Sequence, residues 1–167
     1  MSMTSVYLAL GSNQTCPRQQ LLLAVHEISA LVGVKVCDVS RVFLSEAMGP
    51  RQAHYYNIVL HCKVSVDAPK VFLRTLKVLE QRLGRQRASE RWGPRCIDID
   101  IIYWQGVSLV SPELTIPHIG CWYRLFVLLP WLDVAGHDGV LSARIRLAVI
   151  NNRQKAYGPG QFLGALI

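Results

Sequence analysis

The sequence has little charge and lacks an apolar run long enough to cross a membrane. Only 17% of its 167 residues are charged, whereas 51% are hydrophobic. The longest apolar stretch, Leu125 to Ala135, contains Pro130 and Asp133 and is shorter than the roughly 20 residues that a spanning helix needs. The first 13 residues also lack the basic segment of a secretory signal. These absences exclude a disordered chain and predict a cytoplasmic protein with a substantial core.

Cysteines suited to a disulfide framework or a zinc site are also missing. The five cysteines are odd in number, and they include no Cys-x-x-Cys pair and no histidine at ligand spacing. They are Cys16, Cys37, Cys62, Cys96 and Cys121. We therefore expect reduced thiols, mostly buried, as in a cytosolic protein.

No linker, internal repeat or low-complexity tract divides the chain, so we expect one domain over residues 1–167. A chain of this length buries roughly 70% of the surface that its unfolded form exposes, so it needs no covalent staple. Eighteen Lys and Arg against eleven Asp and Glu give a net charge of +7. This excess favours polyanionic partners such as nucleotides, phosphorylated metabolites or nucleic acid.

Hydrophobic spacing predicts the element order βαββαβ. Strands are expected at residues 6–10, 34–44, 55–66 and 97–104, and helices at residues 17–33 and 67–84. This order is typical of an α+β, ferredoxin-like fold, in which an antiparallel sheet carries its helices on one face. The C-terminal extension, roughly residues 106–167, is expected to hold loops, a further strand near Phe126 and a weak C-terminal helix.

Five arginines lie within fourteen residues, at the end of the second predicted helix and in the loop after it. They are Arg82, Arg85, Arg87, Arg91 and Arg95. Planar guanidinium groups match phosphate oxygens in bidentate geometry. A run of charge is normally a solvated face, but Gly84, Trp92, Gly93 and Pro94 favour a shaped loop. The segment therefore predicts a phosphate-binding site.

The strand that follows carries two carboxylates, Asp98 and Asp100, on one face, while Ile97, Ile99 and Ile101 point to the other. Like charges at this spacing repel each other unless a cation or several donors stabilise them, and hard oxygen ligands suit Mg²⁺ that bridges phosphates. The alternative is a solvent-exposed strand with incidental aspartates.

Because the arginine loop leads directly into this pair, we predict metal-dependent phosphoryl-type transfer. The Gly-x-x-x-x-Gly-Lys-Ser/Thr loop of P-loop proteins is absent.

Two further groups of residues are candidates for substrate contacts. His118 lies beside Pro117 and six residues before Arg124, a spacing that would let both reach a nucleotide, although a single histidine is more often packed or on the surface. A flat pocket could be lined by Tyr55, Asn57 and Phe126, with two rings that stack on a heterocycle and an amide that binds its edge. Without the other motifs these three residues would be ordinary core.

Five motifs follow one another along the chain with nearly unbroken spacing. They are Ala9-Leu10-Gly11-Ser12-Asn13; Gly49-Pro50 with Tyr55-x-Asn57; Leu83-Gly84-Arg85-x-Arg87; Arg91-Trp92-Gly93-Pro94-Arg95-x-Ile97-Asp98-Ile99-Asp100; and Pro117-His118 with Arg124-x-Phe126-Val127-Leu128. Through these motifs the chain resembles the 6-hydroxymethyl-7,8-dihydropterin pyrophosphokinase family of folate biosynthesis over about residues 6–132.

The resemblance implies transfer of the β,γ-pyrophosphoryl unit of ATP to the pterin hydroxymethyl group, with release of AMP and with two Mg²⁺ ions held by Asp98 and Asp100. The catalytic residues it implies are Arg85, Arg95, Asp98 and Asp100. The nucleotide would be bound by Glu80, near the ribose, and by Arg91, Trp92, Arg95, His118 and Arg124, and the pterin by Tyr55, Asn57, Asp98 and Phe126. We expect a monomer that binds ATP and the pterin but neither nucleic acid nor a membrane, and association with neighbouring folate-pathway enzymes stays open.

The chain departs from the family pattern at three places. Residues 45–48, Ser-Glu-Ala-Met, replace the usual threonine and proline, so we expect a looser loop with an added acid. Ala88 replaces a polar residue, and residues 119–123 are unusually apolar. Because no departure touches the aspartates, we expect the chemistry to survive with altered affinities.

Two other functions remain as alternatives. The first is an RNA-binding module on the same fold, but its Lys/Arg-Gly-Phe/Tyr-Gly/Ala-Phe-Val-x-Phe/Tyr run is absent. The second is a catalytically silent relative that binds nucleotide or pterin for regulation.

Overall fold

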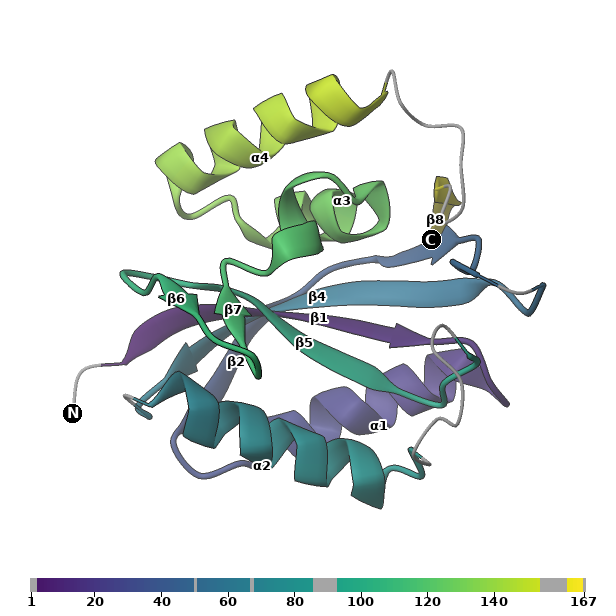
Figure 1. Cartoon of the computed structure of the whole chain (residues 1–167), viewed down its shortest axis with the longest axis horizontal. Helices are drawn as coiled ribbons and strands as arrows, with labels where there is room; N and C mark the ends of the chain where they lie inside the picture. The colour runs from purple at the N-terminus through teal and green to yellow at the C-terminus, as the bar shows by residue number, and fades with distance from the viewer. Residues whose placement is uncertain (1–2, 50, 67, 86–92, 154–161, 167) are drawn as a thin grey trace.

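A central antiparallel sheet lies between two pairs of helices in the computed structural model, which describes residues 3–49, 51–66, 68–85, 93–153 and 162–166. Helices α1 (Pro17–Ser29) and α2 (Pro69–Arg82) cover one face. Helix α3 (Leu125–Val134) lies on the other face, and α4 (Gly139–Arg153) packs on its outer side (Figure 1). Each face of the sheet therefore packs against its own apolar layer.

The main sheet contains six strands, all paired in the antiparallel direction. They are β1 (Thr4–Ser12), β2 (Val34–Val39), β3 (Val42–Ser45), β4 (Tyr55–Val64), β5 (Asp98–Trp104) and β8 (Phe162–Leu166). The order across the sheet is β5-β1-β4-β3-β8, and β2 pairs with β4 beside β3. Strand β5, which carries the aspartate pair, is thus an outer strand in the described part of the chain.

The strand expected at residues 34–44 is divided into β2 and β3 by Ser40 and Arg41. The Ser40 hydroxyl accepts a hydrogen bond from the Val59 amide (2.9 Å), and the Ser40 amide donates to the Val59 carbonyl (3.0 Å). Arg41 turns outward to form an ion pair with Asp133 of α3 (2.8 Å). The alternation of apolar and polar residues could not predict this interruption, because Ser40 still bonds to β4 as a strand residue would.

The first core fills the space between the sheet and the helices α1 and α2. Alternate residues of β1, Val6, Leu8 and Leu10, are buried there against Phe72 and Leu76 of α2. Both helices begin with proline and end close to the predicted positions, so the two core helices are confirmed. They share one face of the sheet, as the sequence predicts.

The second core covers the opposite face, and the sequence did not predict it. Tyr7 and Val59 pack against Leu128 and Trp131 of α3, which are fully buried. The predicted strand near Phe126 is wrong, because residues 125–134 form a helix. A short, continuous apolar run has the same appearance in a buried strand and in a buried helix, so periodicity could not distinguish them.

The rest of the C-terminal extension agrees in part with the sequence analysis. The weak C-terminal helix is present as α4, whereas strand β8 was not predicted. Between β5 and α3 the chain forms a small hairpin, β6 (Leu109–Val110) with β7 (Thr115–Ile116), and the short helix η1 (Ile119–Trp122). Across the described ranges, no helix is both long and apolar enough to cross a membrane.

The cysteines are all unpaired thiols, but the expectation that most are buried is not met. Cys62 and Cys121 are buried and Cys96 is partly buried, whereas Cys16 and Cys37 are exposed. Burial raises the pKa of Cys62 and of Cys121 to about 12, so both remain protonated at neutral pH.

Candidate active site

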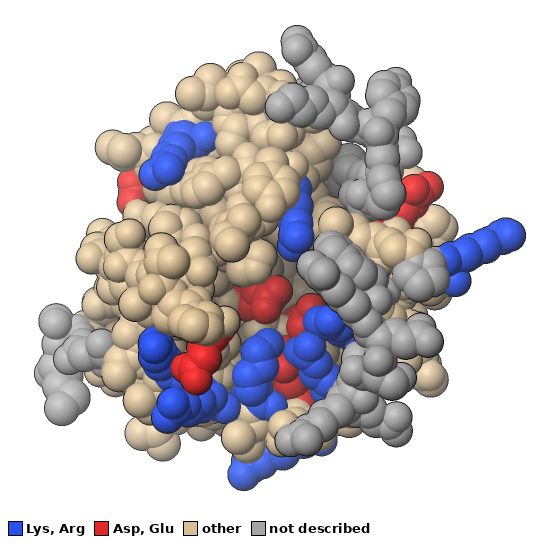
Figure 2. Space-filling model, in the orientation of Figure 1, with Lys and Arg blue, Asp and Glu red and all other residues tan. Residues whose placement is uncertain are grey.

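A cavity of about 300 Å³ lies between the sheet and the start of α3. Its walls come from the ends of β1 and β4, the loop after β3, strand β5 and the segment from His118 to Val127. Figure 2 shows acidic side chains in the recess of this face, with Lys and Arg side chains gathered around them. The combination of carboxylates, cations and apolar walls suits a ligand with phosphate groups and a flat ring.

Both aspartates of β5 face this cavity. Asp98 and Asp100 line it and are half-buried, whereas Ile97, Ile99 and Ile101 are buried in the first core. The predicted division of this strand into a carboxylate face and an apolar face is therefore confirmed.

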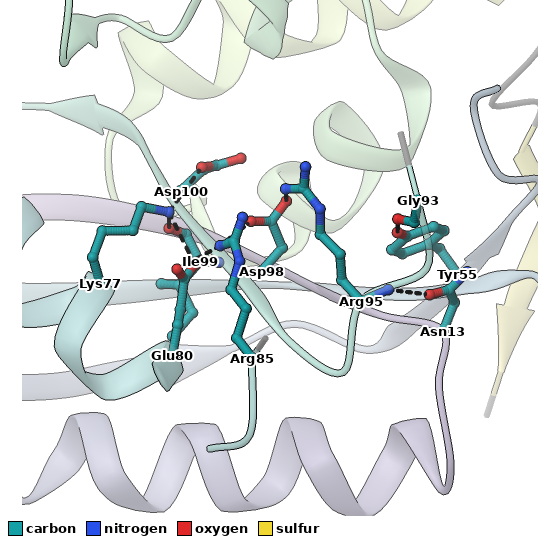
Figure 3. A network of polar contacts seen from close by, with 10 residues as sticks. All are labelled: Asn13, Tyr55, Lys77, Glu80, Arg85, Gly93, Arg95, Asp98, Ile99 and Asp100. Carbon is teal, nitrogen blue, oxygen red and sulfur yellow. Dashed lines mark hydrogen bonds and ion pairs between the residues drawn. The ribbon is translucent and has the colours of Figure 1, made fainter. Parts of the chain in front are cut away.

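Two arginines hold the Asp98 carboxylate, one on each oxygen (Figure 3). Arg85 Nη1 lies 2.7 Å from Oδ1, and Arg95 Nη1 lies 2.8 Å from Oδ2. All three side chains remain between 20% and 26% exposed, so solvent and ligands can still reach them. The arginine segment and the aspartate pair thus form one charged cluster, as their adjacency in the sequence predicted.

Asp100 shares the cavity with Asp98, and its side chain is the more exposed of the two, at 42% against 25%. Burial among protein groups, and then the negative charge of Asp98, raise the pKa of the Asp100 carboxyl above its usual range. Lys77 and His118 act in the opposite direction. A bound cation would relieve the repulsion between the two carboxylates.

The aspartates fit a hard divalent cation, although they could not hold it alone. Among the residues that the structure describes, no cluster of three or more His, Cys, Asp or Glu side chains could bind a metal. Mg²⁺ typically takes one or two carboxylates and completes its octahedron with phosphate oxygens and water. The donor set is thus the kind that binds a metal together with a phosphorylated substrate.

Arg124 is a further cation at the cavity, and its Nε is buried without a hydrogen-bond partner. Its guanidinium lies 5.9 Å from the ring centroid of Tyr123 and 6.0 Å from that of Phe126. Gly120 leaves room for it, because a Cβ there would come within 2.6 Å of Arg124 Nε. A buried, unpartnered guanidinium nitrogen beside a polar cavity is suited to an anion.

His118 lines the same cavity and has a defined orientation. Its Nδ1 accepts a hydrogen bond from the Gly120 amide (3.0 Å), so a neutral ring carries its proton on Nε2. Its backbone amide donates to the Ile102 carbonyl of β5 (3.0 Å). His118 and Arg124 therefore meet at the cavity, as their spacing predicted.

The three residues expected to bind a flat ring also line the cavity: Tyr55, Asn57 and Phe126. The Asn57 amide nitrogen is fixed by Ser45 Oγ (3.0 Å) and by the carbonyls of Phe43 (3.2 Å) and Tyr55 (3.3 Å). Its orientation is therefore set by protein contacts. The Tyr55 hydroxyl donates to the Gly93 carbonyl at 3.3 Å.

Three predicted nucleotide-binding residues are not placed in this cavity. Arg91 and Trp92 lie outside the described residues. The Glu80 side chain is only 1% exposed, and its carboxylate faces Lys77, Arg85 and the Ile99 amide. Glu80 is thus a buried partner of the charged cluster and does not line the cavity, which departs from its expected place beside the ribose.

Neither Asn13 nor Lys77 stands out as a site residue from its chemistry in the sequence, and the contacts of Asn13 show its role first. Asn13 Oδ1 accepts from the Arg95 amide (2.9 Å), and its Nδ2 donates to Gln52 Oε1 (2.8 Å). Asn13 therefore fixes the backbone beside Arg95. Its position directly after a buried strand, within a Gly-Ser-Asn turn, was the available signal.

Comparisons with known proteins agree with one another. The family model described as 7,8-dihydro-6-hydroxymethylpterin-pyrophosphokinase (HPPK) matches residues 7–136. A 2-amino-4-hydroxy-6-hydroxymethyldihydropteridine pyrophosphokinase of Synechocystis is 38% identical over 126 residues, which are 75% of this chain and 64% of that protein. The Pseudomonas aeruginosa protein of the same name is 37% identical and covers 78% of this chain and 80% of its own.

Solved structures of fused proteins share the fold. A structure of HPPK-DHPS in complex with substrates has a TM-score of 0.68 at 12% identity and covers 91% of this chain and 46% of that chain. The wild-type Plasmodium falciparum HPPK-DHPS gives a TM-score of 0.68 at 15% identity and covers 92% and 42%. This chain therefore spans less than half of those fused chains and 64% of its Synechocystis relative.

Proposed function

We propose that this chain, which belongs to the 7,8-dihydro-6-hydroxymethylpterin-pyrophosphokinase family, transfers the β,γ-pyrophosphoryl unit of ATP to 6-hydroxymethyl-7,8-dihydropterin in folate biosynthesis. The hydroxymethyl oxygen bonds to the β-phosphorus, the bond from that phosphorus to the α,β-bridging oxygen breaks, and AMP leaves with the bridging oxygen. The hydroxyl proton is released to water. The observation that carries this proposal is that Asp98 and Asp100 line one cavity together with Arg95 and Arg124 and with the aromatic rings of Tyr55 and Phe126.

Charge neutralisation is the main task of the side chains in such a transfer. Arg85 and Arg95, which pair with Asp98, would turn to phosphate oxygens when the nucleotide binds. Asp98 and Asp100 would hold Mg²⁺, which would supply charge neutralisation at the phosphates. Arg124 and His118 would bind further phosphate or nucleotide oxygens, since both reach the cavity.

The pterin would lie between Tyr55 and Phe126, beside the fixed amide of Asn57. Aromatic rings stack on a flat heterocycle, and the Asn57 oxygen can accept a hydrogen bond from its edge. Asp98 lines the same cavity and binds both Arg85 and Arg95. The hydroxymethyl group would therefore point toward the charged cluster.

Turnover tests the proposal directly. AMP release from ATP should require both the reduced hydroxymethylpterin and Mg²⁺. Asp98→Ala should abolish turnover, because it removes a metal ligand and the partner of two arginines. Glu113→Ala is a matched control, since Glu113 is exposed on the loop between β6 and β7.

Three results would count against this proposal, the first against its metal site and the other two against the function itself. Near-normal turnover of Asp98→Ala would remove the metal assignment. Pterin or nucleotide binding without AMP release by the unmodified chain would favour the catalytically silent relative. RNA binding with no effect of either substrate would favour the nucleic-acid module.

We propose further that residues 4–104 form a ferredoxin-like βαββαβ core and that the remainder is a C-terminal extension of the same domain. The support is the strand order β5-β1-β4 with β2 and β3 on the far side of β4, where all neighbours are antiparallel. Limited proteolysis that released a stable fragment without α3 and α4 would argue for two separate domains.

We also propose that the chain is a monomer that associates with neighbouring folate-pathway enzymes. The fused HPPK-DHPS chains support this, because they show the same fold joined to a second protein unit. Gel filtration of the chain alone and mixed with such an enzyme would test both statements. A stable homodimer would contradict the first, and separate elution of the mixture would contradict the second.

A further inference from the structure

The outer edge of β5 is covered by two side chains of α2. Strand β5 pairs with β1 on one side only, so the peptide groups on its other side have no strand partner in the described part of the chain. At Ile99 both of these groups are nevertheless bonded (Figure 3). The amide donates to Glu80 Oε1 (2.6 Å), and the carbonyl accepts from Lys77 Nζ (3.1 Å).

Lys77 and Glu80 also bind each other, so that the two side chains and the Ile99 peptide groups form a ring of hydrogen bonds. They lie one helical turn apart, and Lys77 Nζ is 2.9 Å from Glu80 Oε1. The same ammonium lies 3.8 Å from Asp100 Oδ1. The ammonium thus donates hydrogen bonds to two acceptors, Glu80 Oε1 and the Ile99 carbonyl, and forms a longer ion pair with Asp100.

The position of Ile99 gives this contact its importance, because Ile99 separates Asp98 from Asp100. Its side chain is fully buried in the first core, while its peptide groups are held from the edge. Rotation or displacement of this residue would change the distance between the two carboxylates and the direction in which they point. Such a change would misplace a shared cation, since Mg²⁺ demands near-ideal octahedral geometry.

Glu80 extends the contact to the arginines. Its second oxygen, Oε2, pairs with Arg85 Nη1, which also binds Asp98. Burial raises the pKa of the Glu80 carboxyl, and Lys77, Arg85 and the Ile99 amide offset part of this effect. A carboxylate so deeply buried needs these partners, and removal of one of them would leave the charge undercompensated.

We propose that Lys77 and Glu80 are positioning residues, which grip the Ile99 peptide and thereby fix the geometry of the Asp98 and Asp100 pair. The proposal rests on the function proposed above, because it assigns the pair its role in binding the metal nucleotide. Neither residue lines the cavity, so neither needs to touch the substrates. Outer partners of metal ligands commonly change metal affinity or activity by about 10- to 100-fold when they are removed.

Lys77→Met tests this inference, because it keeps the aliphatic stem and removes all three donors. Lys77 is 38% exposed, so the variant should fold. Arg74→Met is the matched control: it removes one positive charge from the same helix one turn earlier, where the side chain is exposed. Three quantities are measured on the full chain: hydrogen exchange of the Ile99 amide, steady-state turnover, and the Mg²⁺ dependence of binding of a non-hydrolysable ATP analogue.

We expect Lys77→Met to speed exchange of the Ile99 amide at least several-fold, while the Val59 amide in the middle of the sheet stays as slow as before. We expect kcat to fall by about 10- to 100-fold, with the KM for the pterin changed by less than about twofold. Binding of a non-hydrolysable ATP analogue should require a different Mg²⁺ concentration, since Lys77 no longer faces Asp100. Arg74→Met should match the unmodified chain in all of these measurements.

The readouts separate this inference from the proposed function. Unchanged Ile99 exchange in Lys77→Met would overturn the grip on the peptide, whatever happens to turnover. Faster exchange with unchanged kcat would make the contact purely structural and would overturn the positioning role. If the unmodified chain catalysed no transfer, the function would fail, and the Mg²⁺ dependence of analogue binding would still decide whether Lys77 positions the aspartates.

Discussion

Gly120 is the residue on which the position of Arg124 depends. A Cβ at residue 120 would come within 2.6 to 2.8 Å of three atoms of the arginine side chain. Because the backbone of Gly120 needs no left-handed conformation, the restriction is one of space only. We expect Gly120→Ala to push the guanidinium away from the cavity at little cost in stability, since a flexible side chain can move.

The expected result for Gly120→Ala is at least about a tenfold weaker affinity for a non-hydrolysable ATP analogue, as lost charge-assisted hydrogen bonds are worth about 1.5 to 3 kcal/mol. Calorimetric titration measures this affinity, and thermal unfolding checks the stability. Gly136→Ala is the control, because a Cβ there meets nothing within 4 Å. Equal nucleotide affinity in both variants would show that Arg124 does not bind the nucleotide.

Site residues could be predicted where their types and spacing form a motif within one segment. Those whose role depends on contacts with another element were missed. Asp98, Asp100 and Arg95 were predicted because alternation along one strand and a nearby cationic loop are visible in one segment. Lys77 was missed because its partners, Ile99 and Asp100, lie on another element. Glu80 was assigned to the ribose, whereas the fold buries it behind the strand.

At the scale of elements, the turn between α1 and β2 depends on Gly33. This residue has φ of 76°, and a Cβ there would overlap the hydroxyl of Ser65. Its carbonyl accepts hydrogen bonds from the Ser65 amide (2.9 Å) and from the Ser65 hydroxyl (3.2 Å). The turn therefore joins the end of the first helix to the end of β4 through one close backbone contact.

We expect Gly33→Ala to destabilise the chain more than Gly106→Ala. Gly106 has the same φ of 76° but open space at the Cβ position, so it isolates the left-handed cost of about 1 to 2 kcal/mol. Gly33→Ala adds an overlap that typically costs about 1 to 3 kcal/mol. Urea unfolding measures the difference, and the additional change Ser65→Ala should recover part of it. Equal losses for the two glycines would contradict the overlap.

Elements were predictable where their apolar residues repeat with a clear period. Helix α2 and strand β5 show such periods, because each buries one face and exposes the other. Helix α3 does not, because Trp131 and Leu128 face the second core and Asp133 is its one exposed residue. A helix that is apolar on almost all sides shows no hydrophobic period in its sequence.

At the scale of the whole molecule, a polar cluster ties the sheet to the loop between α3 and α4. His61 of β4 lies beneath the Tyr7 ring (centroids 4.8 Å apart) and contacts Ser5 Oγ (3.1 Å) through Nε2. Its Nδ1 is 3.4 Å from Asp38 Oδ2, which is also 3.2 Å from Nε2 of His137 in that loop. Burial lowers the pKa of His61, and Asp38 offsets part of this shift.

This pKa shift predicts how stability depends on pH. Because the folded protein disfavours protonated His61 relative to the unfolded chain, the stabilisation by the neutral ring is complete above the unfolded pKa of about 6.5. It is lost as pH falls through the lower, folded value. We expect His61→Gln to lose less unfolding free energy than the unmodified chain between about pH 7 and pH 5.

Urea unfolding at several pH values measures this dependence, with His54→Gln as the control because His54 is exposed. The control should keep the pH dependence of the unmodified chain. The same slope in the His61→Gln variant would show that another group is responsible.

The cavity lies where the layer above the sheet is incomplete, because Phe126 and Val127 on one side and Tyr55 on the other leave a space between them. A flat heterocycle in that space would serve as a guest core residue and complete the packing that the chain's own side chains leave unfinished. The free energy of unfolding would then rise with the concentration of that heterocycle, since a ligand that binds only the folded state stabilises it. The bound ring would then form part of the packed layer on this face of the sheet for as long as it stays.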